Sequence, residues 1–228
     1  MHGEQERARR PRLLATGLHL VGVGDMAWLL VGSGLEMINA WWGKVWHFGV
    51  PDHRWQLSAF AAVYLLRAAV TMFYLLRRKT GWGECVLVGV RSAPCTLSLH
   101  TWVEPTRTTW DWAHGGGGVA LYVFGSCVNT GSELQRKWWK GRPENKIRLY
   151  THGVFRNSQH INYFGDEQPF IGYAFLTGSA GALLVPLVVI AGFVFFDFPE
   201  LDKHLPSRYG PEFEAYAQRT HKFAPFVY

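Results

Sequence analysis

Charged residues and cysteines are both scarce in this chain. Only 18% of its 228 residues are charged, against roughly 25% in a typical soluble domain. The three cysteines show no CxxC or other paired spacing, so the sequence predicts neither a disulfide framework nor a zinc or other metal site. Aromatic residues are abundant, at 15%. This composition excludes a disordered chain, a collagen-like chain and a disulfide scaffold.

The charges that are present gather into blocks. Most of them lie in residues 1–12, 77–79, 133–148 and 200–222. Soluble domains spread charge over every exposed face, whereas membrane proteins confine it to segments between apolar stretches. The mean hydropathy of −0.02 is low for a membrane protein, so it is the placement of charge that indicates one. The net charge of +6 would also suit nucleic acid, but the sequence shows no zinc-finger or helix-turn-helix pattern, and nucleic acid is not expected as a partner.

The apolar stretches predict an all-α fold, a polytopic transmembrane bundle of about six helical segments. A helix of about 20 residues spans the roughly 30 Å hydrocarbon core of a bilayer. The basic blocks then fall on one side, which the positive-inside rule assigns to the cytosol. The expected segments are 13–38, 57–76, 83–103, 111–130 and a helical hairpin with arms 167–178 and 181–197.

Four ionisable residues lie within the first two expected spans. A carboxylate facing lipid costs about 2.5–3.5 kcal/mol at the centre of a membrane. We therefore expect His19, Asp25, Glu36 and Arg67 to face the interior of the bundle.

Polar residues are densest in residues 149–167, directly before the longest uncharged stretch. Such a group at a membrane boundary can bind the amide, ribose and phosphate of an amphiphilic cofactor. The alternative is a helix cap with polar side chains that reach toward water. In helical geometry, one face would carry Arg156, His160, Tyr163 and Glu167, and another Asn162 and Asp166.

Two motifs in this region resemble a known superfamily. Residues 156–166 (RNSQHINYFGD) resemble the R-x-S-x-H-P-N-Y-x-G-[DE] signature of the superfamily that joins steroid 5-alpha-reductases, sterol double-bond reductases and isoprenylcysteine carboxyl methyltransferases. Residues 208–225 resemble its C-terminal element. The likeness covers about residues 133–228 and is closest to an uncharacterised reductase-like branch with a steroid 5-alpha-reductase C-terminal domain. One departure is Ile161 in place of the proline that would fix the start of a helix, which puts the position of His160 in doubt.

The resemblance implies a cofactor pocket in the C-terminal region. Reductases of the superfamily bind NADPH, and its methyltransferases bind S-adenosylmethionine. The N-Y-x-G-D form of residues 162–166 is similar to the reductases. Lys and Arg residues of 133–148 would neutralise phosphate groups, although positive-inside topology explains that block equally well. The implied cofactor-binding residues are Arg156, Ser158, His160, Asn162, Tyr163, Asp166, Tyr209, Tyr216 and Arg219.

Particular roles follow from the same resemblance. Asn162 and Asp166 would hold the nicotinamide amide and the ribose. Tyr209 and Tyr216, seven residues apart, would share one helix face. Gly165 and Gly210 would allow close backbone approach.

The expected function is an integral membrane oxidoreductase that uses NADPH to reduce a C=C bond of a lipophilic, sterol-like or enone-like substrate. A methyltransferase that uses S-adenosylmethionine and a non-catalytic membrane protein on the same scaffold remain alternatives. We expect a basic cytosolic arm (1–12), membrane spans on the substrate side (13–132) and a cofactor-binding region (133–228). The proton donor is left open among several Tyr and acidic residues. The expected location is the endoplasmic reticulum with a cytosolic C-terminus; a plastid or bacterial inner membrane stays open.

Overall fold

The computed structural model describes residues 2–43, 51–76, 82, 115–177 and 179–227, and every regular element within these ranges is a helix. One isolated bridge between Ser158 and His221 is the single β-type pairing of the described residues. The all-helical expectation is therefore confirmed. The predicted span 83–103 and the beginning of the span 111–130 lie outside the described residues.

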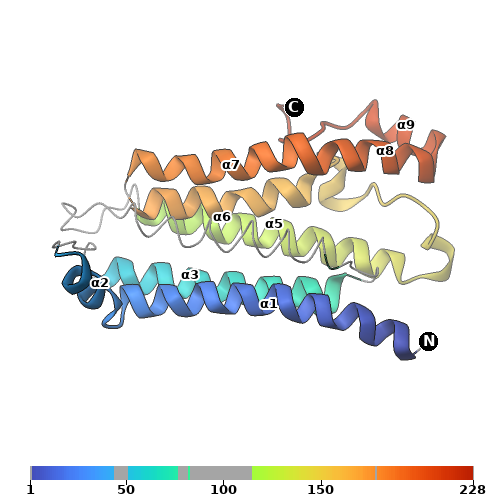
Figure 1. The fold of residues 1–228 in the computed structure, drawn as a ribbon. Coiled ribbons are helices and arrows are strands. Elements are labelled where there is room, and N and C mark those ends of the chain that lie inside the picture. Colours follow the sequence, from blue (N-terminus) through green and yellow to red (C-terminus); the bar gives the residue numbers. More distant parts are fainter. Residues whose placement is uncertain (1, 44–50, 77–81, 83–114, 178, 228) are drawn as a thin grey trace. The chain divides into compact units, whose positions relative to one another are not determined.

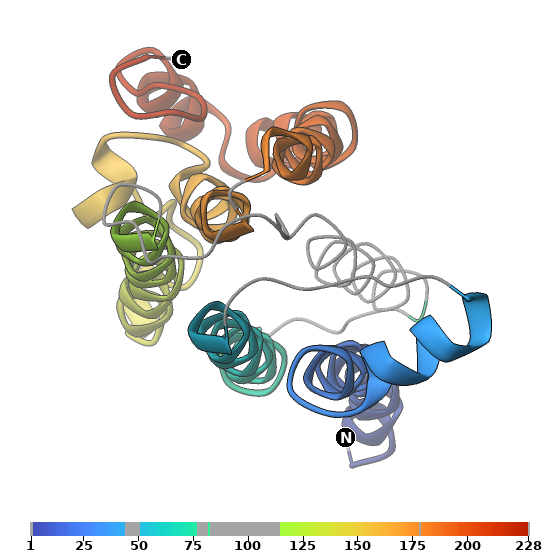
Figure 2. The same ribbon diagram turned by 90° about the vertical axis from the view of Figure 1, so that its left-hand side faces the viewer.

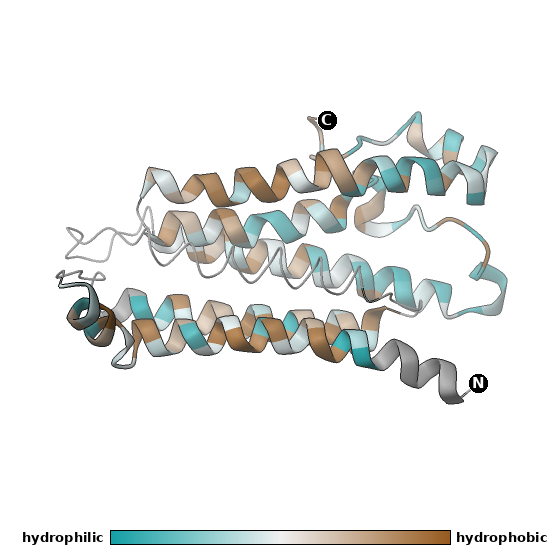
Figure 3. Cartoon of the chain, in the orientation of Figure 1, coloured by the Kyte–Doolittle hydropathy of each residue, from teal (hydrophilic) through white to brown (hydrophobic). Residues whose placement is uncertain are grey.

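Three described helices are long and apolar enough to cross a membrane: Arg10–Leu30, Arg54–Leu75 and Ala180–Tyr209. Large apolar side chains along the last of these, such as Leu187, Val188 and Phe195, are exposed. Figure 3 shows the apolar colouring along α7 (Leu184–Gly192) and the polar colouring of α8 (Phe198–Tyr209). Exposed apolar residues in such numbers are typical of a surface that faces lipid, so these helices indicate a membrane protein.

The described elements, in chain order, begin with three helices and a π-helical turn. They are α1 (His2–Leu30), α2 (Gly34–Trp42), α3 (Pro51–Val70) and η1 (Thr71–Leu75). The second expected span, 57–76, agrees with α3 and η1. The first is wrong at its end, because α1 stops at Leu30 and a turn over residues 31–33 separates it from α2. A side chain at Gly32 or Gly34 would meet Trp28, so the turn between α1 and α2 needs glycine at both positions.

The chain divides into two compact units. The first consists of residues 1–118 and 173–185. Within it α1 lies against α3 (Figures 1 and 2). The two helices meet at His19, which stacks on Tyr64 with ring centroids 5.8 Å apart. His19 is buried as expected, whereas the expectation for Asp25 and Glu36 is wrong, because both are exposed.

The second unit, residues 119–172 and 186–228, carries the polar segments of interest. It contains nearly all of α5 (Gly117–Lys140), the part of α6 (Ile161–Thr177) before Tyr173, the part of α7 from Pro186, η6 (Phe193–Asp197), α8 and α9 (Pro211–Ala217). Short helical turns η3 (Pro143–Asn145) and η4 (Gly153–Arg156) lie between α5 and α6, and η5 (Ala180–Leu183) precedes α7.

The expected helical hairpin is present, because α6 ends at Thr177 and the next helical segment begins at Ala180. In the second unit the two arms run antiparallel: Tyr163, near the start of α6, contacts Phe193 with ring centroids 4.9 Å apart (Figure 1). The helix start is also clear. α6 begins at Ile161, the position that a proline holds in the signature. The replacement of that proline by isoleucine therefore does not shift the start of the helix.

Helices α5 and α6 cross at two glycines. A Cβ atom on Gly165 would come within 2.5 Å of the backbone nitrogen of Asn129, and one on Gly125 within 2.6 Å of the carbonyl oxygen of Gly165. The Asn129 side chain also donates a 2.9 Å hydrogen bond to the carbonyl of Asn162. The expected close approach at Gly165 is therefore confirmed, and its partner is α5.

Candidate functional site

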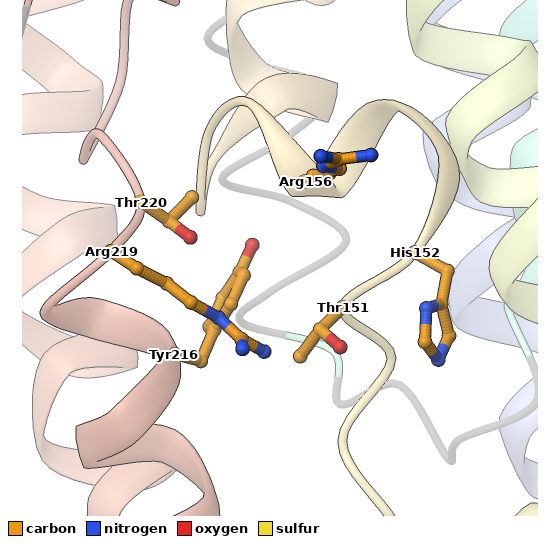
Figure 4. A pocket seen from close by; sticks show the side chains of 6 residues that line it. All are labelled: Thr151, His152, Arg156, Tyr216, Arg219 and Thr220. Carbon is orange, nitrogen blue, oxygen red and sulfur yellow. The ribbon is translucent and has the colours of Figure 1, made fainter.

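A pocket of about 530 Å³ opens in the second unit (Figure 4). Three segments form it: the loop and turn before α6, the helix α9, and the chain just after α9. A volume of this size falls within the range of roughly 300–1,000 Å³ that is usual for ligand pockets. The lining residues are Thr151, His152, Arg156, Tyr216, Arg219 and Thr220.

The loop side of the pocket is shaped by an aromatic group and one glycine with a positive φ angle. Tyr150 contacts Phe155 and His152, with ring centroids 5.6 and 6.0 Å apart. Between them Gly153 has φ +60°, and a side chain there would meet Gln135. Only glycine adopts this conformation at little cost. The turn η4 that follows carries Arg156 to the pocket.

Tyr216 forms the wall opposite the loop. Its side chain is buried, and its hydroxyl donates a 2.6 Å hydrogen bond to the carbonyl of Phe155. Burial raises the pKa of this phenol. The hydroxyl is thus occupied within the protein, and Tyr216 offers the pocket a ring face and a rigid anchor for α9.

Two arginines give the pocket its charge. Arg156 and Arg219 are both exposed. Figure 4 shows Arg219 extending toward the middle of the pocket, between Tyr216 and Thr151, with Arg156 and His152 on the far side. Neither arginine forms an ion pair with a carboxylate in the part of the chain that the structure describes. Two guanidinium groups with hydroxyls beside them suit an anion, and phosphate in particular.

The other predicted cofactor residues lie elsewhere in the second unit. Ser158 and His160 are buried against the C-terminal chain. Asn162, Tyr163 and Asp166 lie on α6, where the Tyr163 ring packs on Phe193 and Phe198. Tyr209 is the last residue of α8. None of these six lines the described pocket, and their role in binding a cofactor stays a prediction.

Two geometric expectations are wrong. Arg156 cannot share a helix face with His160, Tyr163 and Glu167, because it belongs to η4 and α6 begins five residues later. Tyr209 and Tyr216 cannot share one either, because α8 ends at Tyr209 and α9 begins at Pro211.

The break between those two helices explains Gly210. This residue has φ +51° and ψ −129°, a conformation that side chains disfavour. No atom would meet a Cβ there. Gly210 therefore serves chain direction, and the expected close approach at this position is wrong.

Two residues of the basic block, Lys140 and Arg148, hold the loop after α5. Lys140 donates hydrogen bonds to the carbonyl of Arg148 and, at 3.2 Å, to the hydroxyl of Tyr209. Arg136 pairs with Glu133 at 2.5 Å, and Arg148 with Glu212 at 3.9 Å. No Lys or Arg of residues 133–148 lines the pocket.

Three lining residues were not selected from the sequence: Thr151, His152 and Thr220. The first two belong to the polar stretch 149–167 but lie before the recognised signature, and Thr220 adjoins Arg219. Their position next to charged members of the two motifs is the signal that would have found them. Among the described residues, no group of three or more His, Cys, Asp or Glu side chains is placed to hold a metal ion.

His160 is a titratable group near the site whose pKa is strongly shifted. Its ring stacks on Phe198 with centroids 4.3 Å apart, and its Nε2 atom lies 3.7 Å from Asp202. Burial lowers the pKa of His160 to about 4, although the Asp202 carboxylate opposes the shift; the Lys222 ammonium adds to it. The imidazole is therefore neutral at neutral pH.

This neutral histidine predicts acid sensitivity. A histidine in the unfolded chain has a pKa of about 6.5, so between pH 6.5 and about 4 the unfolded state binds the additional proton. The contribution of His160 to stability should fall as the pH is lowered through this window and be constant above it, with a total loss on the order of 3 kcal/mol. Melting curves in detergent should show a shallower pH slope for His160→Gln than for the wild type. Equal slopes would contradict the burial of a neutral ring.

The chain matches the model of a protein family. A family model described as a protein of unknown function (DUF1295) matches residues 83–220. No curated protein matches the chain. The family match covers more than half of the 228 residues and includes both Arg156 and Arg219. The chain therefore belongs to the DUF1295 family of proteins of unknown function.

Proposed function

We propose that this protein is a membrane reductase that binds NADPH in the pocket of the second unit and reduces a C=C bond of a lipophilic substrate. The observation that carries the proposal is the pair Arg156 and Arg219, which face one pocket without a carboxylate among its lining residues.

The chemistry of the pocket fits the phosphate-bearing part of NADPH. Guanidinium groups bind phosphate through paired hydrogen bonds, and the hydroxyls of Thr151 and Thr220 can add further ones. His152 can donate to an oxygen from the rim. S-adenosylmethionine carries no phosphate, and its sulfonium would be repelled by two arginines. The described lining thus favours the dinucleotide.

Two further observations support this proposal. The residues that resemble the steroid 5-alpha-reductase superfamily include both arginines, and the family match spans the signature and most of the C-terminal element. Under the proposal Asn162 and Asp166 hold the nicotinamide end, farther along α6.

The membrane setting fits a lipophilic substrate. Three described helices can cross a bilayer, and we propose six spans in total with the cofactor region in the cytosol, at the endoplasmic reticulum. Bound NADPH supplies the hydride for such a reduction. The chain binds and orients the cofactor through its arginines and supplies the proton.

The test is a ligand titration. Purified protein in detergent should bind NADPH with micromolar or tighter affinity and should show no saturable binding of S-adenosylmethionine. A lipophilic enone should then accelerate the loss of NADPH absorbance. Binding of S-adenosylmethionine alone would favour a methyltransferase. A cellular role that survives Asn162→Ala with Asp166→Ala, after cofactor binding is lost, would favour a non-catalytic protein.

A further inference from the structure

The C-terminal chain is fastened to the signature motif through its backbone. Four consecutive carbonyls, those of residues 220–223, accept hydrogen bonds from the three consecutive residues Ser158, Gln159 and His160. We refer to residues 158–160 together with 220–223 as the clasp. No other β-type pairing occurs among the residues that the structure describes.

Together the donors of the clasp reach four carbonyls, and the Ser158 hydroxyl also lies 3.3 Å from the carbonyl of Lys222. The side-chain amide of Gln159 donates to Thr220 at 3.0 Å. The backbone amides of Gln159 and His160 donate to His221 and Lys222 at 2.8 and 3.0 Å. The hydroxyl of Ser158, which is fully buried, donates to Phe223 at 2.6 Å. The Ser158 hydroxyl is small enough to fit at this buried position. The carbonyl of Phe223 needs its hydrogen bond, because a buried carbonyl without a partner is costly.

Side chains reinforce the clasp on its other side. Lys222 pairs with Asp202 of α8 at 2.7 Å. The ring of Phe223 packs against Phe198 and Phe164, with centroids 5.3 and 6.0 Å apart. The tail is thereby tied to both α6 and α8.

The clasp lies next to the pocket along the chain. Tyr216 is anchored on Phe155 through its hydroxyl, and Thr220 is the first residue held by the clasp. Arg219, the arginine that extends into the pocket, lies between these two fixed points (Figure 4). A segment held at both ends loses little further conformational entropy when its side chain binds a ligand.

We propose that Ser158, Gln159 and His160 are positioning residues, which hold the C-terminal chain so that Arg219 and Thr220 face the pocket. They act on the ligand through Arg219 and do not touch it. The proposal rests on the proposed function in so far as that ligand is NADPH. Under this proposal Ser158 and His160 of the signature help to assemble the pocket, and Gln159 has the same role.

The test introduces the same negative charge at two glutamines, Gln159 in the clasp and Gln218 outside it. Gln159→Glu keeps the size of the side chain but places a carboxylate against the carbonyl of Thr220. Gln159→Met removes the donor without adding charge. Gln218→Glu is the matched control, because this residue is exposed beside Arg219 and makes no side-chain contact in the clasp. Hydrogen exchange at the amides of Gln159 and His160, measured without ligand, reports whether the tail is docked.

We expect both Gln159 variants to exchange these amides at least about tenfold faster than the control. NADPH affinity should fall roughly tenfold, and the fall should largely disappear in an Arg219→Ala background, because the effect passes through Arg219. If the losses of NADPH affinity from the Gln159 and Arg219 variants are additive, the role of Gln159 is merely structural and the proposal is overturned. Unchanged hydrogen exchange in the Gln159 variants would overturn it as well.

A second probe separates this proposal from the proposed function. Inorganic pyrophosphate presents the anion that the two arginines would bind. If the wild type binds pyrophosphate but not NADPH, the proposed function is wrong, and pyrophosphate affinity then tests the clasp in the same cycle. Faster exchange with unchanged affinity for a probe that binds would overturn the positioning role and leave the proposed function standing. If neither probe binds, both proposals are wrong.

Discussion

Replacing Gly125 or Gly165 by alanine should destabilise the protein by about 2–3 kcal/mol, which is at the upper end of the usual cost of overpacking. A Cβ atom on Gly165 would lie 2.5 Å from the backbone nitrogen of Asn129 and 3.0 Å from its Cα atom. Backbone atoms of a helix cannot move aside as a flexible side chain can, so the two helices must separate. Small residues at such crossings are the main source of helix association in membranes. Thermal melting in detergent, together with the yield of folded protein, measures the effect.

Gly131 provides the matched control for this prediction. It lies on the same helix α5, but no atom would meet a Cβ at this position. Gly131→Ala should therefore be neutral or stabilise by up to roughly 1 kcal/mol, because alanine favours a helix over glycine. If all three alanine variants melt alike, the close crossing of α5 and α6 is wrong.

The features that could be predicted from the sequence are those that depend on local composition. A predominantly apolar stretch of sufficient length forms a helix in a membrane whatever it packs against. The second span was therefore foreseen, as was the break between Thr177 and Ala180. The end of α1 at Leu30 was not, because the residues that follow are also apolar. There the close approach of Gly32 and Gly34 to Trp28 accompanies the turn, and a pair of glycines around a serine is a weak signal beside so much apolar sequence.

The site was harder to predict because spacing presumes a continuous helix. Gly153 and Gly210 take positive φ angles and interrupt the chain on either side of the relevant residues. The interruptions move Arg156 away from the α6 face and Tyr209 away from Tyr216. Even so, the two motifs contain three of the six lining residues. Arg156 belongs to the signature, and Tyr216 and Arg219 belong to the C-terminal element.

The clasp could not have been foreseen at all from residue types. Its acceptors are backbone carbonyls, which every sequence possesses, and only their placement by α9 and the tail makes them partners of residues 158–160. A serine and a histidine within a cofactor signature are easily taken for ligand-binding groups. In the structure Ser158 is fully buried, and its hydroxyl donates a hydrogen bond to the carbonyl of Phe223.

Replacing Arg219 by alanine should weaken NADPH binding by roughly 10- to 100-fold, as expected for the loss of a charge-assisted hydrogen bond to a phosphate. Arg156→Ala should act in the same direction. Both side chains are exposed and neither has an ion-pair partner among the described residues. Their removal should thus leave the melting temperature without ligand nearly unchanged, so that the loss is one of binding and not of folding.

Two companion variants decide what kind of contact each arginine makes. Arg219→Lys keeps the charge but lacks the planar pair of donors, so it should recover only part of the affinity. Arg142→Ala removes the same charge from an exposed site off the pocket and should change affinity by less than about twofold, mostly through long-range attraction that added salt screens. If Arg142→Ala weakens NADPH binding as much as Arg219→Ala does, the general positive charge of the unit attracts the cofactor and the pocket does not bind it. If Arg219→Ala binds NADPH as tightly as the wild type, the cofactor lies elsewhere, and the α6 residues Asn162 and Asp166 become the next place to look for it.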